Sequence, residues 1–179
     1  MYKRCRLILL VLLALHTIVW SGNSYANKSR EYQLKAAYLL NFARFVYWPE
    51  QVFQSKTDGF NICIYGENPF GENLDRLANK TINNRKITLK YSETEEGLKS
   101  CHILFVSQSK EENYKLVIEN LENATILTVS DIEGFGHSHG MIEFVRVKNK
   151  IKFEINVDKS TQASIKYRSQ LLEVAEQLR

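Results

Sequence analysis

"CHILFVS", residues 101–107, and "TILTVS", residues 125–130, decide how this chain folds. Both are short runs of apolar and β-branched side chains, and their central residues are apolar in succession. Such strands are too apolar to leave a face in water, which is typical of a parallel sheet covered by helices. The two runs therefore predict a sheet with helices packed on both faces.

Two further strand-like runs precede them, "FNICIY" at residues 60–65 and "RKITLKY" at residues 85–91. Helical patterns near Phe70–Asn79 and Glu111–Leu121 separate the runs. Strands that alternate with helical segments indicate βαβ units and a largely parallel sheet.

The end of the chain has a different pattern. "MIEFVRV" at residues 141–147 and "IKFEINV" at residues 151–157 alternate apolar with polar side chains, and "KNK" joins them. They predict an antiparallel hairpin, followed by a final helix over Ala163–Leu178. The predicted fold class is α/β, a mixed and mainly parallel sheet with a C-terminal antiparallel hairpin and helices on both faces.

The segment "SREYQLKAAYLLNFARFVYW", residues 29–48, repeats apolar side chains every three or four positions. This spacing predicts an amphipathic helix with Ser29 as its N-cap and Pro49 beyond its end.

The first 26 residues have the order of a secretory signal peptide. Cations in "MYKRCR" precede an apolar run of about 14 residues, which is too short to span a bilayer, and "SGNSYA" ends in a small-x-small pattern. We expect cleavage near Ala26, export, no direct membrane insertion and a single domain over residues 27–179. Loss of Lys3, Arg4 and Arg6 lowers the formal charge from +4 to +1, which gives no reason to expect nucleic-acid binding.

Cleavage would leave two cysteines, Cys63 and Cys101. An even number in an oxidising compartment favours a disulfide, although two buried free thiols are the alternative.

Two glycine-containing loops are candidate ligand sites. "YGENPFG", residues 65–71, follows a predicted strand and opens a helix, where α/β sheets commonly bind ligands and anions. "GFGHSHG", residues 134–140, follows another predicted strand and the acidic "DIEG". Neither has the spacing of a dinucleotide or Walker loop, so turns whose glycines serve geometry explain both equally. The candidate ligand-loop residues are Gly66, Glu67, Asn68, Gly71, Asp131, His137 and His139.

The two histidines could also bind zinc, with Asp131, Glu133 or His102 as further ligands. No third and fourth ligand is defined by the spacing, so we expect no metal and no cofactor. The default reading of "GFGHSHG" is an exposed turn.

No catalytic set is recognisable, since no serine lies in a G-x-S-x-G elbow and no carboxylate pair stands out. We therefore expect a binding or regulatory protein and not an enzyme. Tyr47 and Trp48, at the end of the predicted helix, are candidate anchors for a protein partner.

The order of motifs resembles the YfiR-type periplasmic proteins over almost all of residues 27–179. The strongest marks are "KAAYLLNFARFVYWP" at residues 35–49, "YGENPFG", and "FEIN" at residues 153–156. The resemblance implies a periplasmic, often dimeric protein that binds the periplasmic domain of an inner-membrane diguanylate cyclase. Such a protein holds the cyclase inactive and lowers cyclic di-GMP. An alternative is a small-molecule-binding module that signals to another receptor, such as a sensor histidine kinase.

The resemblance also implies that Cys63 and Cys101 correspond to a cysteine pair that links two strands in the family. Some relatives carry a second pair near the "MIEF" hairpin, and this chain has none there. A glycine pair is common where this chain has His139 and Gly140, so the histidines look like local variation of a family turn.

Overall fold

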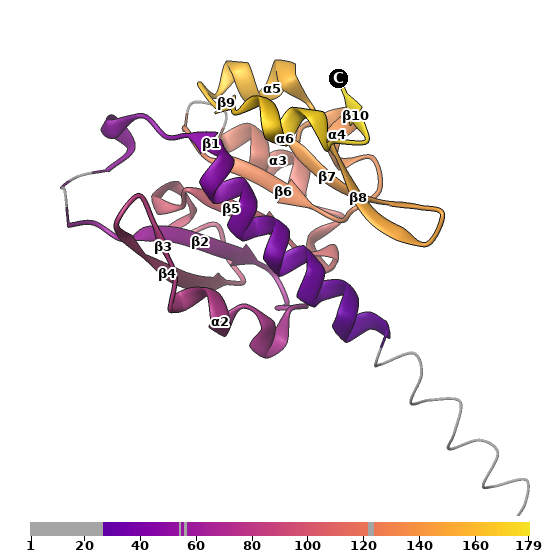
Figure 1. The fold of residues 1–179 in the computed structure, drawn as a ribbon, viewed down its shortest axis with the longest axis horizontal. Coiled ribbons are helices and arrows are strands. Elements are labelled where there is room, and N and C mark those ends of the chain that lie inside the picture. Colours follow the sequence, from indigo (N-terminus) through magenta and orange to yellow (C-terminus); the bar gives the residue numbers. More distant parts are fainter. Residues whose placement is uncertain (1–26, 54, 56, 122–123) are drawn as a thin grey trace, which may run out of the picture.

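A computed structural model describes residues 27–53, 55, 57–121 and 124–179 (Figure 1). The predicted signal peptide, residues 1–26, lies outside the described residues. An eight-stranded sheet runs in the order β10-β8-β7-β6-β5-β2-β4-β3, and a separate pair, β1-β9, is antiparallel. Within the large sheet only the β7–β8 and β3–β4 pairs are antiparallel, which confirms the mixed, mainly parallel α/β fold.

The centre of the sheet consists of the apolar runs that the sequence singled out. These strands are β2 (Phe60–Tyr65), β4 (Arg85–Ser92), β5 (Ile103–Val106) and β6 (Leu127–Ser130). All four residues of β5 and all four of β6 are buried. Burial on both faces explains why β5 is apolar throughout. In β6 the buried Thr128 hydroxyl accepts a hydrogen bond from the Met141 amide, and the buried Ser130 hydroxyl donates one to the Val106 carbonyl.

Helices cover both faces of the sheet, as predicted. The N-terminal helix, described over residues 27–45, crosses one face (Figure 1). It contributes Leu39 and Phe42 to a core that also contains Ile62 and Phe105. Helix α3 (Tyr114–Asn120) covers the other face, where its Val117 and Ile118 share a core with side chains of the intervening strand positions: Cys63, Tyr65, Leu104 and Val106.

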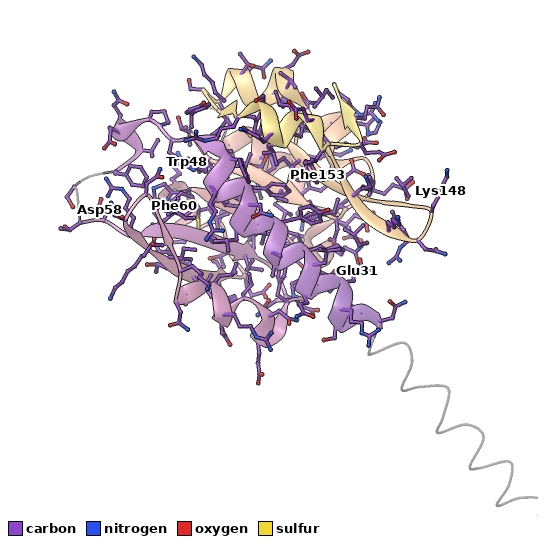
Figure 2. All side chains as sticks on the ribbon, viewed as in Figure 1. Glu31, Trp48, Asp58, Phe60, Lys148 and Phe153 are labelled. Carbon is purple, nitrogen blue, oxygen red and sulfur yellow. A yellow bond between two sulfur atoms is a disulfide. The ribbon has the colours of Figure 1, made fainter. Side chains whose placement is uncertain are left out.

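The C-terminal hairpin is confirmed in β7 (Ile142–Val147) and β8 (Lys150–Ile155). Lys148 and Asn149 form its turn, and both have positive φ, 46° and 63°. Two consecutive left-handed residues match the right-handed twist of the flanking strands. The hairpin extends away from the body of the sheet, with Lys148 at its tip (Figure 2).

The predicted final helix over Ala163–Leu178 is wrong. Helix α5 (Val157–Gln162) ends just before this segment, which contains β9 (Lys166–Tyr167), α6 (Ser169–Glu173) and β10 (Gln177–Leu178). Ser164 breaks the helical path with φ 60°, and Arg179 bonds through its backbone to Ile155 and Val157. The open edge of β8 thus recruits the end of the chain as a strand, against its helical periodicity.

Other elements are shorter than the patterns suggested. The helix expected near Phe70–Asn79 consists of η2 (Gly71–Asn73) and α2 (Asp75–Ala78). Strand β3 (Thr81–Ile82) was not expected and forms a tight hairpin with β4 through Asn83 and Asn84, which both have positive φ. The remaining short turns are η1 (Glu50–Val52), η3 (Leu98–Ser100), η4 (Gln108–Lys110) and α4 (Phe135–Ser138).

The N-terminal helix differs from the prediction at its start, since residue 27 is already helical and Ser29 is therefore not the N-cap. Its end agrees, because the helix stops at residue 45, before Pro49. Strand β1 (Val46–Tyr47) follows at once and pairs with β9. Among the described residues, no helix has the length and apolar character needed to cross a membrane.

Candidate functional site

A groove of about 810 Å³ lies where β5 and β6 end. The N-terminal helix, the loop after β6 and the β7–β8 hairpin form its walls. The charged residues that line it are Glu31, Lys35, Asp131, Glu133, Glu143, Arg146 and Glu154, with His137 at the same loop. Carboxyl ends of parallel strands are the usual place for a site in an α/β sheet. This groove is therefore the candidate functional site.

Lys35 and Asp131 form a buried ion pair at the inner end of the groove. The Lys35 ammonium lies 2.5 Å from Asp131 Oδ2, and both side chains are only 4% exposed. Tyr32 donates its hydroxyl hydrogen to the same oxygen at 2.7 Å. Burial, reinforced by the Asp131 charge, raises the pKa of Tyr32, so its hydroxyl stays protonated and remains a donor. The cluster fastens the helix to the end of β6.

Glu31 links this pair to the hairpin. It lies one helical turn before Lys35, with its carboxylate 2.6 Å from the ammonium, and it also pairs with Arg146 on β7. A chain of alternating charges thus connects the loop after β6, the helix and the hairpin. Both cations of the groove thus face a carboxylate of the protein, but five carboxylates line the groove against two cations, so the groove is acidic.

The loop "GFGHSHG" closes around Glu143 of β7. Its Gly134 and Gly136 amides donate to the two oxygens of the buried Glu143 carboxylate at 3.0 and 2.8 Å. A glycine-rich loop with free amides could bind a phosphate, but here a carboxylate of the protein occupies those donors. A Cβ at Gly140 would overlap the Phe135 ring, so packing requires glycine there. These contacts account for the spacing of the glycines without a bound nucleotide.

The two histidines of this loop do not converge. His137 is 54% exposed and its Nδ1 lies 3.7 Å from Glu143, whereas His139 Nε2 lies 2.9 Å from Glu119 of α3. His102 precedes β5 and therefore lies at the opposite end of the strand from the groove. Within the described part of the chain, no group of three or more metal-binding side chains occurs. The zinc alternative has no supporting geometry.

The loop "YGENPFG" lies outside the groove. Gly66 has φ 96° and faces the Ser109 hydroxyl so closely that a Cβ would collide with it. The Glu67 amide donates to that hydroxyl at 2.9 Å, and Asn68 Oδ1 accepts from the Phe70 amide at 3.0 Å. The structure thus brings only Asp131 and His137 of the candidate loop residues into the groove.

Cys63 and Cys101 form a disulfide on the α3 side of the sheet. Their Cα atoms are 5.8 Å apart, and the bridge joins β2 to the residue before His102, at the start of β5. Both cysteines are buried, so the bridge lies within the core and not at the groove.

Next to the bridge is an aromatic stack that the sequence did not reveal. The His102 ring lies between Phe53 and Phe60, with ring centroids 4.7 and 4.8 Å away. The Arg85 guanidinium lies over the outer face of Phe53 at 3.7 Å. Burial, with the positive charges of Arg85 and Lys90, lowers the pKa of His102 to about 4. The imidazole is thus a neutral core group that accepts a hydrogen bond from the Asn61 amide at 2.9 Å.

The structure separates the two candidate anchors for a partner. The Trp48 ring packs edge-on against Phe60 and donates its indole hydrogen to the Ala43 carbonyl at 2.8 Å. Tyr47 remains half exposed, with the Arg168 guanidinium 4.6 Å from its ring centroid. Tyr47 is the candidate whose side chain can reach another protein.

Sequence reasoning missed five charged residues of the groove, Glu31, Lys35, Glu143, Arg146 and Glu154, and also Tyr32, which contacts Asp131. Only Lys35 left a signal, because it lies on the same helical face as Tyr32, Ala36 and Leu39, where a cation is out of place. A charged residue at a core position requires a buried partner, but the sequence could not show which one.

Comparison with solved structures finds one described as the ABC domain in complex with L-Trp from Streptococcus pneumonia. The two structures share 8% sequence identity with a TM-score of 0.48. The match covers 73% of this protein and 58% of the Streptococcus chain. No curated protein matches the sequence. Residues 32–176 match the YfiR/HmsC-like family, a range that contains every groove residue except Glu31, the disulfide and every strand up to β9. The chain belongs to the YfiR/HmsC-like family.

Proposed function

We propose that this protein is a periplasmic negative regulator that binds the periplasmic domain of an inner-membrane diguanylate cyclase and lowers cyclic di-GMP. The observation that carries the proposal is the family match over residues 32–176, which points to a periplasmic regulatory role. The named partner and the direction of regulation come from the resemblance of the sequence motifs.

The geometry of the groove is consistent with a binding protein. Among the described residues that line it, no serine or cysteine is present to act as a nucleophile, and the buried charges are engaged with one another. Their main physical effect is to hold the helix, the sheet and the hairpin in one arrangement. A rigid surface of this kind suits a protein that stabilises one conformation of its partner.

Tyr47 is the residue that we assign to partner contact. Its ring is 52% exposed at the end of the N-terminal helix, and Tyr is favoured at the energetic centres of interfaces. Tyr91 on β4 is a matched control, because it is 49% exposed. We expect Tyr47→Ala to abolish repression in cells and Tyr91→Ala to preserve it, with normal protein levels for both.

The experiment is to measure intracellular cyclic di-GMP in a deletion strain complemented by the wild type or by either variant. A rise on deletion that wild type and Tyr91→Ala reverse, but Tyr47→Ala does not, supports the repressor role and the Tyr47 surface together. An unchanged level on deletion would contradict repression of a cyclase. Equal repression by both variants would contradict the role of Tyr47 alone.

The groove gives a specific reason to keep a second candidate, a small-molecule-binding module that signals to another membrane receptor. The two glycine loops were expected to line its pocket, but only the loop after β6 contributes to the groove. Arg146 is its most accessible cation, being 50% exposed in its side chain. A metabolite that raises the melting temperature of wild type but not of Arg146→Gln would favour this candidate.

A further inference from the structure

The β7–β8 hairpin carries a concentration of positive charge. The segment "RVKNKIK", residues 146–152, contains four cations and no acid, namely Arg146, Lys148, Lys150 and Lys152. The tight turn at Lys148 and Asn149 holds Lys148 at the tip of a hairpin that projects from the body (Figure 2). These long side chains lie around the projecting β7–β8 hairpin and are not confined to one face of the sheet.

The start of the N-terminal helix adds two cations to the same end of the molecule. The ion pair between Arg146 and Glu31 joins the hairpin to the helix, and Figure 2 shows Glu31 and Lys148 toward the same end. Lys28 and Arg30 are exposed in the turn just before Glu31. We call the six residues the basic end: Lys28, Arg30, Arg146, Lys148, Lys150 and Lys152.

Most of this charge is not neutralised by the protein. Among the described residues, Lys28, Arg30, Lys148 and Lys150 have no ion-pair partner. Residues 27–179 have a formal charge of +1, since +4 loses the three cations of residues 1–26, so everything outside the basic end sums to −5. This end is therefore locally basic, and the acidic groove adjoins it at Arg146.

Protection of a sheet edge explains only part of the pattern. Strand β10 covers β8 at Glu154 and Ile155 alone, so Lys150 and Lys152 lie on an open edge, where lysine prevents pairing with other strands. Lys148 lies in a turn, and Lys28 and Arg30 lie on a helix. Their clustering at the same end requires another reason.

The composition of the basic end indicates what kind of surface it fits. Protein interfaces are depleted in lysine and centre on aromatic or apolar anchors. The exposed large apolar side chains of the described chain are Leu34, Tyr47, Tyr91, Leu116, Val174 and Leu178, and none belongs to the hairpin or to residues 27–31. Clusters of flexible cations without such anchors are typical of segments that bind anionic lipid headgroups. We propose that the basic end binds the anionic headgroups of a phospholipid membrane peripherally.

This contact would orient the domain. The N-terminal helix runs from the basic end toward Trp48 (Figure 2), and residues 31–45 alone span roughly 21 Å at 1.5 Å per residue. Tyr47, which follows this helix in β1, would then lie at the end of the helix that is farther from the bilayer. The inference requires export to a membrane-bounded compartment but no particular protein partner.

The test is flotation of the protein, purified from cells that express the full gene, with vesicles of defined lipids. Acidic vesicles contain equal parts of phosphatidylethanolamine and phosphatidylglycerol, and neutral vesicles contain phosphatidylcholine in place of phosphatidylglycerol. Binding to neutral vesicles reports any contribution of apolar segments. We expect the acidic vesicles to bind at least about tenfold more tightly at low salt, with the difference lost as salt screens the charges.

Lys148→Glu combined with Lys150→Glu, which we call the arm variant, should remove this preference for acidic vesicles. Lys80→Glu combined with Lys86→Glu is the matched control, because these exposed lysines flank the β3–β4 hairpin at the opposite edge of the sheet. All four side chains are exposed, so both variants should melt like wild type. Equal binding of wild type to acidic and neutral vesicles, or undiminished binding of the arm variant, would overturn the proposal.

Cellular cyclic di-GMP separates this inference from the proposed function. If the arm variant binds acidic vesicles like wild type but fails to repress, the arm serves a protein partner and the membrane assignment is wrong. If the variant with Lys148→Glu and Lys150→Glu no longer binds acidic vesicles, but deletion of the gene leaves cyclic di-GMP unchanged, the membrane contact stands and the proposed function fails.

Discussion

At the residue scale, burial decides the behaviour of the titratable groups. His102 is packed between two phenylalanine rings beside two cations, so its protonated form is unfavourable in the folded protein. Glu143 is buried as well, and two backbone amides donate hydrogen bonds to its two carboxylate oxygens. Burial is therefore accompanied by different partners at the two side chains: aromatic rings and cations at His102, and amide donors at Glu143.

The pKa of His102 predicts how stability changes with pH. It is about 4 in the folded protein against an ordinary 6.5, so between these values the unfolded chain binds a proton that the folded protein does not. The contribution of His102 is complete above pH 6.5 and is lost as pH falls toward 4, by at most about 3 kcal/mol. Urea unfolding of wild type and His102→Asn between pH 7 and pH 4 measures it. The variant should show a shallower loss across this window, whereas the exposed His137→Asn should follow wild type; identical slopes for all three would refute the assignment.

Glu143→Gln tests whether the carboxylate organises the glycine-rich loop. The amide keeps the shape of the side chain but loses the charge that two backbone donors stabilise, so we expect a loss of about 1–3 kcal/mol. Glu133→Gln is the control, because Glu133 lines the same groove but is exposed. Chemical denaturation gives both values. A change of the same size in the two variants would mean that general groove charge, and not the loop contacts, is responsible.

At the element scale, the ion pair between Lys35 and Asp131 fixes the position of the N-terminal helix on the sheet. Lys35→Met would leave the Asp131 carboxylate buried without its cation, which typically costs about 3–5 kcal/mol. Adding Asp131→Asn should recover part of that loss, because the buried charge is then gone. Unfolding free energies of the two single variants and the double variant give the coupling.

The half-exposed ion pair between Lys152 and Glu176 is the comparison for the Lys35 and Asp131 variants. Lys152 and Glu176 are 3.6 Å apart, with side chains 39% and 37% exposed, and solvent screens their attraction. Lys152→Met should therefore change stability by less than about 1 kcal/mol. Additive effects of Lys35→Met and Asp131→Asn would show that the helix is held by apolar packing alone.

At the scale of the whole molecule, the disulfide restricts how far the unfolded chain can expand. Cys63 and Cys101 are 38 residues apart, and the loop that they close contains β3 and β4. Replacing both cysteines by serine should lower the free energy of unfolding by about 2–4 kcal/mol. Urea unfolding of wild type with and without reductant, beside the double variant, measures the effect. Reductant should destabilise wild type only, and an unchanged midpoint for the double variant would exclude a stabilising bridge.

The division of the molecule into ends matters equally at this scale. The groove adjoins the basic end at Arg146, whereas Tyr47 follows the opposite end of the N-terminal helix. A single rigid helix therefore separates the proposed membrane contact from the proposed partner contact. Substitutions of exposed residues can therefore alter the membrane contact or the partner contact separately.

The sequence by itself determined the elements whose signals are local. A continuous apolar run specified β5, and a run rich in apolar and β-branched residues specified β6. Alternation specified the hairpin, and the periodicity of residues 29–48 specified the long helix. The even cysteine count expected after export predicted the bridge between Cys63 and Cys101, and the family resemblance implied the same pair. These features follow from the chain alone because each depends on spacing between near neighbours or on a motif that can be read directly.

Only the tertiary structure decided the end of the chain and the groove. Residues 163–178 carry helical spacing, but the unpaired edge of β8 offers backbone hydrogen bonds that no local pattern reveals, and β10 forms there. Lys35 and Asp131 are 96 residues apart and Glu31 and Arg146 are 115 residues apart, so both pairs meet only after the sheet is assembled. Long-range pairing depends on which surfaces remain unsatisfied after the core has formed, and one-dimensional spacing does not contain that information.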